Sequence, residues 1–193
     1  MPVPSITLDD IKAARQIVYR TLRPTALLKH PLLDLETGLD IMVKHENHNP
    51  TGAFKVRGGL NLVARLSPEE RRGVITATTG NHGQSIAMAC EREGVPCTIV
   101  VPIGNNPEKN AAMHAFGATV LDVGRDFDEA REHVEKLRVE NGLRYVHSAN
   151  EPDLIAGVAT YAMEIFDDAP DVVVILVPIG GGSGACGCGL VRT

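Results

Sequence analysis

The sequence has 193 residues, of which 44% are hydrophobic and 22% are charged, as is typical of a globular protein with a buried core. Nineteen Lys and Arg residues stand against 24 Asp and Glu residues, and neither sign forms a run that would suggest a nucleic-acid stripe or a polybasic membrane patch. No run approaches the ~20 apolar residues that span a bilayer, and residues 1–10 lack a signal-peptide pattern. We therefore expect a cytoplasmic protein that acts on small molecules, with no nucleic-acid or membrane partner.

The predicted elements begin with a helix from a capping segment at residues 7–10 to about Arg20, followed by a strand over residues 40–45. From Gly73 onward, short β-branched runs alternate with stretches of helical period, which predicts repeated βαβ units around a mostly parallel sheet. The expected strands of this part are residues 74–78, Cys97–Val101, Thr119–Asp122 and residues 172–177. The last strand is apolar throughout, as a strand covered on both faces should be.

Two amphipathic helices are expected to cover the sheet. The apolar stripe of the first consists of Phe127, Ala130, Val134 and Leu137. The second stripe runs through residues 154–165, after a proline at position 152 that suits the first turn of a helix. Because no low-complexity linker divides the chain, a second domain is predicted to be inserted into the first.

Three segments are candidates for chemistry. The first places Lys55 among small residues, in Asn49-Pro50-Thr51-Gly52-Ala53-Phe54-Lys55-Val56-Arg57-Gly58-Gly59. The second follows an expected strand and opens a helix, where free backbone N–H groups attract a carboxylate or a phosphate; it contains Thr78, Thr79, Gly80, Asn81, His82, Gly83 and Gln84. Taken alone, the first segment also fits a solvated helix start, and the second fits a turn capped by Thr79 or Asn81.

The third segment is a glycine-rich turn whose exposed backbone donors suit a phosphate. It contains Gly180, Gly181, Gly182, Ser183 and Gly184. Its spacing Gly182-x-Gly184-x-x-Gly187 also matches the dinucleotide fingerprint, so a nicotinamide enzyme is an alternative from this segment alone.

Metal chemistry is not expected. His45-Glu46-Asn47-His48 is one residue short of the H-E-x-x-H spacing that places two ligands on one helical face. The cysteines, including the C-x-C pair Cys186 and Cys188, lack C-x-x-C spacing and are expected to be reduced and unpaired.

Taken together and in this order, the three segments resemble the threonine and serine dehydratase family of fold-type II pyridoxal-phosphate enzymes. The family patterns Pro-Thr-Gly-Ser-Phe-Lys-x-Arg-Gly, Ser-x-Gly-Asn-His-x-Gln and a glycine-rich phosphate loop are all closely followed. The resemblance implies three-layer αβα parallel-sheet domains similar to the tryptophan synthase β fold. It divides the chain into a large cofactor-binding domain (residues 1–50 and 149–193), incomplete because family enzymes continue past the phosphate loop, and a small inserted α/β domain (residues 51–148).

The resemblance also implies roles for individual residues. Lys55 would carry pyridoxal 5'-phosphate as a Schiff base and act as the catalytic base, with a depressed pKa, while Phe54 would lie beside the pyridine ring and Asn81 would bond the ring hydroxyl. The phosphate would bind Gly180, Gly181, Gly182, Ser183 and Gly184. The substrate carboxylate would bind Thr78, Thr79, Gly80, Asn81 and His82.

The implied reaction is β-elimination from a hydroxy amino acid such as L-threonine or L-serine, giving a 2-ketoacid and ammonia. Two residues depart from the family pattern: Ala53 replaces a common serine, and Thr79 stands where dehydratases often carry alanine and related racemases carry serine. A racemase and a non-catalytic remnant are therefore the alternatives. A homo-oligomer is the expected assembly.

Overall fold

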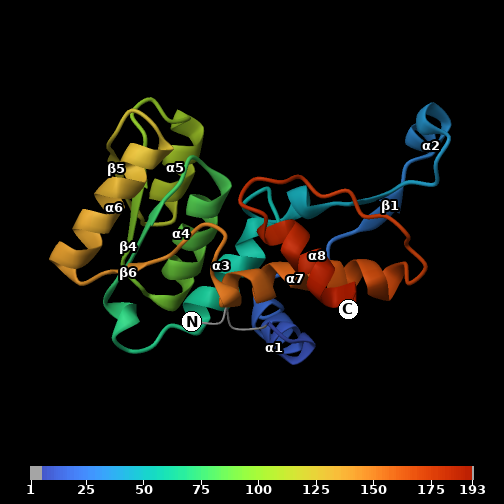
Figure 1. The fold of residues 1–193 in the computed structure, drawn as a ribbon, viewed down its shortest axis with the longest axis horizontal. Coiled ribbons are helices and arrows are strands. Elements are labelled where there is room, and N and C mark those ends of the chain that lie inside the picture. The colour runs from blue at the N-terminus through green and yellow to red at the C-terminus, as the bar shows by residue number, and fades with distance from the viewer. Residues whose placement is uncertain (1–5, 193) are drawn as a thin grey trace.

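The computed structural model describes residues 6–192 and shows an α/β fold around a four-stranded parallel sheet (Figure 1). The strand order is β5-β4-β3-β6, and every neighbouring pair is parallel. The strands are β3 (Val74–Ala77), β4 (Cys97–Val101), β5 (Thr119–Asp122) and β6 (Arg144–Tyr145). The three strands predicted between residues 74 and 122 therefore form, and β6 adds a fourth at one edge.

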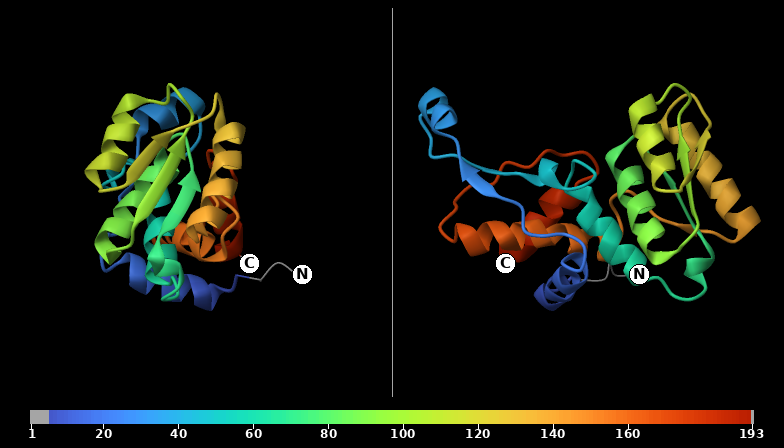
Figure 2. Two further views of the ribbon diagram at one scale, coloured as in Figure 1. Left: turned by 90° about the vertical axis from the view of Figure 1, so that its left-hand side faces the viewer. Right: turned by 180° about the vertical axis from the view of Figure 1, so that it is seen from behind.

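Helices cover both faces of the sheet, which confirms the three-layer arrangement (Figure 2). The covering helices are α4 (Asn81–Glu93), α5 (Pro107–Ala115) and α6 (Phe127–Asn141). Ile75 and Val100 pack against Ala130 and Val134 of α6, on the face predicted from its apolar stripe. Alternate strand residues such as Ile99 point to the opposite face and join the main core with α4 and α5.

A second group of helices packs beside the sheet. These helices are α1 (Leu8–Val18), α3 (Lys55–Ala64), α7 (Pro152–Asp168) and α8 (Ser183–Arg192). Thr7 caps α1 with a capping box, and Pro152 occupies the first turn of α7, both as predicted. Helix α3 contacts α4 on one side and α7 on the other, so it joins the sheet-containing part to the helical part.

Short elements complete the described chain. They are β1 (Leu27–Lys29), α2 (Pro31–Thr37), β2 (Met42–Lys44), and the 3-10 turns η1 (Glu46–His48) and η2 (Glu70–Arg72). Strands β1 and β2 pair antiparallel, and α2 lies at the tip of this projection (Figure 1). No helix within residues 6–192 has the length and apolar character needed to cross a bilayer. All four cysteines are free thiols.

The predicted strand over residues 172–177 is wrong. These residues are extended without strand pairing, because no other segment of the described chain lies alongside to accept and donate ladder hydrogen bonds. Its expected cover on both faces is also missing, since Leu176 is 91% exposed and Val173 is 79% exposed. Val172, Ile175 and Val177 are partly buried and pack against the main core, whereas Val174 is also exposed.

Candidate active site

A pocket of about 310 Å³ opens at the carboxyl edge of the parallel sheet. The segments that follow β3, β4, β5 and β6 all contribute to its wall, as expected for ligand sites in open α/β sheets. The predicted residues that line it are Lys55, Thr78, Thr79, Gly80, Asn81, His82 and Gly181. The three candidate segments therefore meet at one place: the first through Lys55, the second through residues 78–82 and the third through Gly181.

Lys55 is the first residue of α3, and its Nζ atom points to the opposite wall of the pocket. It donates hydrogen bonds to the carbonyl oxygen of Ser148 at 2.9 Å and to the Ser183 hydroxyl at 3.0 Å. The Lys55 ammonium also lies 5.7 Å from the centre of the Phe54 ring. Burial lowers the pKa of Lys55, in the direction predicted from the sequence.

The loop between β3 and α4 is held by Thr78. The Thr78 hydroxyl accepts hydrogen bonds from the backbone N–H groups of Gly80 and Gly83. The N-cap of α4 is Gly80, so the caps proposed from the sequence, Thr79 and Asn81, are both wrong. Both of these side chains are exposed instead, and the buried Thr78 binds the N–H group of Gly83 in the first turn of the helix.

His82 lies beneath this loop, and its hydrogen bonds fix its tautomer. Thr76 donates its hydroxyl proton to the carbonyl oxygen of Val146 at 2.7 Å, so it accepts from His82 Nε2–H at 3.0 Å. The Nδ1 atom is therefore an unprotonated acceptor, and it has no partner in the described part of the chain. Burial, followed by the charge of Lys55, lowers the pKa of His82 to about 3.

The glycine-rich turn leads directly into α8. Gly182 adopts the left-handed conformation, with φ 89°, and the chain then enters the helix at the buried Ser183. Phe54 lies against the beginning of this helix, since a Cβ atom at Gly184 would be 3.3 Å from its ring. Gly180, Gly182 and Gly184 do not line the pocket themselves. The unpaired segment before the turn also removes the strand that a dinucleotide fingerprint requires.

Four further residues line the pocket and were not predicted from the sequence: Ala77, Lys109, Phe127 and Ser148. Ser148 follows β6, a strand of two residues that is too short to show a periodic pattern. Lys109 lies in the first turn of α5, after a loop of five residues from β4. Only their position could have indicated them, because Ala77 ends a strand and the other three follow strands whose carboxyl ends reach the same edge of the sheet.

The histidine-rich segment has a structural role. Glu46 binds the Arg57 guanidinium at 2.7 Å, and the His45 ring stacks on His48 with centres 4.9 Å apart. Among residues 6–192, no three His, Cys, Asp or Glu side chains are arranged to hold a metal ion.

The comparisons with known proteins agree with this geometry. The sequence profile described as "Pyridoxal-phosphate dependent enzyme" matches residues 18–192. The L-threonine ammonia-lyase of Thermotoga maritima is 43% identical over 178 residues, which are 92% of this chain and 44% of that protein. The catabolic L-threonine dehydratase of Staphylococcus aureus is 36% identical over 179 residues, which are 92% of this chain and 52% of that protein.

Solved structures show the same similarity. A pyridoxal 5'-phosphate-dependent aspartate racemase superposes with a TM-score of 0.92 at 34% identity, over 100% of this chain and 60% of that chain. The processed threonine deaminase isoform 2 of Solanum lycopersicum superposes with a TM-score of 0.87 at 34% identity, over 94% of this chain and 52% of that chain. The chain thus spans about half the length of the relatives it matches.

Proposed function

Since the chain belongs to the family of pyridoxal-phosphate dependent enzymes, we propose that Lys55 holds the cofactor. We further propose that the protein eliminates water and ammonia from a hydroxy amino acid such as L-threonine or L-serine. The product would be the corresponding 2-ketoacid. The observation that carries this proposal is the position of Lys55 Nζ, which lines the pocket beside the Thr78–His82 loop and bonds Ser183 at the start of α8.

The described residues fit the cofactor. Lys55 offers a partly desolvated amine, as imine formation requires. The backbone N–H groups of Ser183, Gly184 and Ala185, in the first turn of α8, have no hydrogen-bond partner among residues 6–192 and suit a phosphate. Gly180, Gly181 and Gly182 would let that phosphate approach the backbone. Phe54 would lie beside the ring and Asn81 would bond its hydroxyl.

The chemistry then divides between the cofactor and the chain. When bound, pyridoxal 5'-phosphate supplies an electron-withdrawing ring that lowers the barrier to removal of the α-proton. Lys55 Nζ is the base that takes this proton, because its lowered pKa leaves more of the neutral amine at neutral pH. The N–H groups at the start of α4 orient the substrate carboxylate.

The first test is the visible absorption of the purified chain after incubation with pyridoxal 5'-phosphate, followed by borohydride reduction and peptide mapping. We expect a visible band and a modified Lys55. Lys55→Ala should lose both, whereas the matched variant Lys136→Ala, at an exposed position of α6, should keep both. An unmodified Lys55, or label spread over surface lysines, would refute the proposed site and favour a non-catalytic remnant.

A racemase is the second candidate, and Thr79 is the observation that favours it. Its side chain is exposed at the pocket wall, where a hydroxyl could exchange a proton with the substrate. Incubation with L-serine, followed by separate assays of pyruvate and D-serine, distinguishes the two reactions. For a lyase, pyruvate should predominate and Thr79→Ala should change its rate little. D-serine that disappears in Thr79→Ala would establish the racemase.

Two further proposals accompany this function. Residues 51–148 would form the small domain, which includes the sheet, and residues 1–50 and 149–193 would form the large domain. The packing of Ile11 and Ala14 of α1 against Ala156 and Ala159 of α7 supports this division, because it joins the two separate parts of the large domain. A cytoplasmic location and a homo-oligomeric assembly stay predictions.

A further inference from the structure

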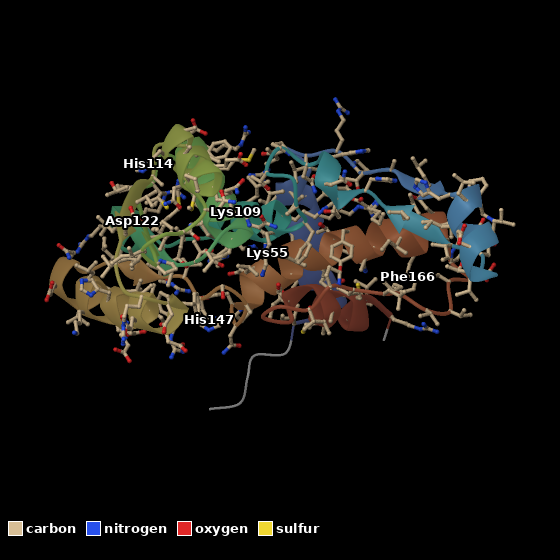
Figure 3. All side chains as sticks on the ribbon, turned by 90° about the horizontal axis from the view of Figure 1, so that it is seen from above. Lys55, Lys109, His114, Asp122, His147 and Phe166 are labelled. Carbon is tan, nitrogen blue, oxygen red and sulfur yellow. The ribbon has the colours of Figure 1, made fainter. Side chains whose placement is uncertain are left out.

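The pocket has an unbalanced positive charge. Lys55 and Lys109 both line it, and none of its lining residues is acidic. Figure 3 shows the two lysines near the middle of the molecule, between the sheet and α7. Lys109 forms no ion pair with any described residue, in contrast to many other cations of the chain. The role proposed for Lys55 leaves the second ammonium without an assigned partner.

The backbone of Lys109 is fixed at the start of α5. Asn106 caps this helix, and its side-chain oxygen accepts hydrogen bonds from the N–H groups of Glu108 and Lys109. The Lys109 side chain then extends across the backbone of Gly80. A Cβ atom at Gly80 would lie 2.5 Å from Lys109 Nζ and 2.8 Å from Cδ, so the missing side chain provides the space that the ammonium occupies.

This position puts the ammonium beside the N-terminus of α4, a helix of 13 residues. The backbone N–H groups of Asn81 and His82 in its first turn have no hydrogen-bond partner within residues 6–192. A lysine cation beside the positive end of a helix dipole is unfavourable unless an anion lies between them. The ammonium and the N–H groups therefore converge on one position for a single anionic group.

We propose that Lys109 is a substrate-binding residue whose ammonium pairs with the α-carboxylate of the amino-acid substrate, together with the N–H groups of α4. The inference rests on the proposed function, and it adds a side chain that the lysine, loop and glycine motifs do not contain. The cofactor phosphate is the other anion of the proposed reaction. It has its own N–H donors at the start of α8, which leaves the Lys109 position for the carboxylate.

The experiment begins with the chain without cofactor, titrated with propionate at constant ionic strength while thermal unfolding is followed. Propionamide, which has the same shape without the charge, is the ligand control. We expect Lys109→Gln to weaken propionate binding about tenfold, equivalent to about 1.4 kcal/mol. Lys109→Arg should restore most of the affinity because it keeps the charge. The matched control Lys136→Gln removes a lysine charge outside the pocket and should bind as the unaltered protein does.

The second arm uses the chain loaded with pyridoxal 5'-phosphate and follows its visible band during titration with L-serine. Lys109→Gln should load the cofactor with unchanged affinity, bind L-serine about tenfold more weakly, and raise KM with little change in kcat. Weaker cofactor loading with unchanged L-serine binding would assign Lys109 to the phosphate and overturn the proposal. Unchanged propionate and L-serine binding would also overturn it. Propionate binding that depends on Lys109 in a chain that takes up no cofactor would instead refute only the proposed function.

Discussion

His82 shows how a single buried residue links the site to stability. Its side chain is only 5% exposed, and burial lowers its pKa from 6.5 to about 3. In the unfolded chain the imidazole binds a proton as the pH falls through about 6.5, whereas in the folded chain it stays neutral until about pH 3. The unfolded state therefore gains the extra proton, and the free energy of unfolding must fall with pH within this window.

We predict that the protein loses about 2 kcal/mol more stability than His82→Gln when the pH falls from about 7 to about 5. The measurement is urea unfolding at both pH values for both proteins. His114→Gln, which removes an exposed imidazole from α5, is the control and should follow the unaltered protein. Equal pH dependence of the unaltered protein and His82→Gln would show that His82 titrates in the folded state as it does in the unfolded state.

Among the individual residues of the pocket, the sequence predicted those that belong to motifs. It missed those that the fold alone brings to the pocket. Lys55 and residues 78–82 could be found because their segments occur together with the glycine-rich turn in the order of a known family pattern. Lys109 could not, because a lysine in the first turn of a helix is ordinary on any surface. The buried state of His82 also depends on Thr76 and Val146, whose contacts with it form only in the folded sheet.

The position of Lys55 depends on the close packing of α3 against α7. A Cβ atom at Gly157 of α7 would lie 2.5 Å from the carbonyl oxygen of Arg57 in α3. A Cβ atom at Gly58 would lie 2.7 Å from the carbonyl oxygen of Leu154. Because both neighbours are backbone atoms, the helices would have to separate to accept a methyl group at either position.

We predict that Gly157→Ala lowers the free energy of unfolding by about 1–3 kcal/mol, the usual cost of overpacking. Gly189→Ala in α8 is the matched control, since a Cβ atom there meets no other group within 4 Å. It should stabilise the protein by up to about 1 kcal/mol, because alanine favours the helix over glycine. Chemical denaturation measures both values. If Gly157→Ala were as stabilising as Gly189→Ala, the close approach of the two helices would be wrong.

Among the elements, the sequence predicted those whose pattern is local. Period and capping residues located α1, α6 and α7, and β-branched runs located β3, β4 and β5. Residues 172–177 carry the same local signal as a buried strand, yet they form none. A strand exists only where neighbouring segments pair with it. Pairing between distant segments cannot be predicted from the residues of either segment alone.

A buried ion network connects the parts of the whole molecule. Arg57, which is fully buried in α3, binds Glu46 of η1 at 2.7 Å and Glu164 of α7 at 2.6 Å. Lys44 of β2 binds Glu164 at 2.7 Å, and Tyr19, which follows α1, donates to the same carboxylate. Burial by itself would lower the pKa of Arg57, but its hydrogen bonds to the two carboxylates raise it overall. The network therefore contains two cations and two anions in balance.

The balance makes the network sensitive to the loss of any one charge. We predict that Arg57→Met lowers the free energy of unfolding by about 3–5 kcal/mol, because it leaves the buried Glu164 and the partly buried Glu46 without their shared partner. Arg138→Met, which breaks the exposed pair with Glu135 on α6, should cost less than about 1 kcal/mol. Guanidinium unfolding followed by circular dichroism measures both. A loss in Arg57→Met as small as that in Arg138→Met would mean that water replaces the guanidinium, and that α3 is held to the rest of the molecule by apolar packing instead.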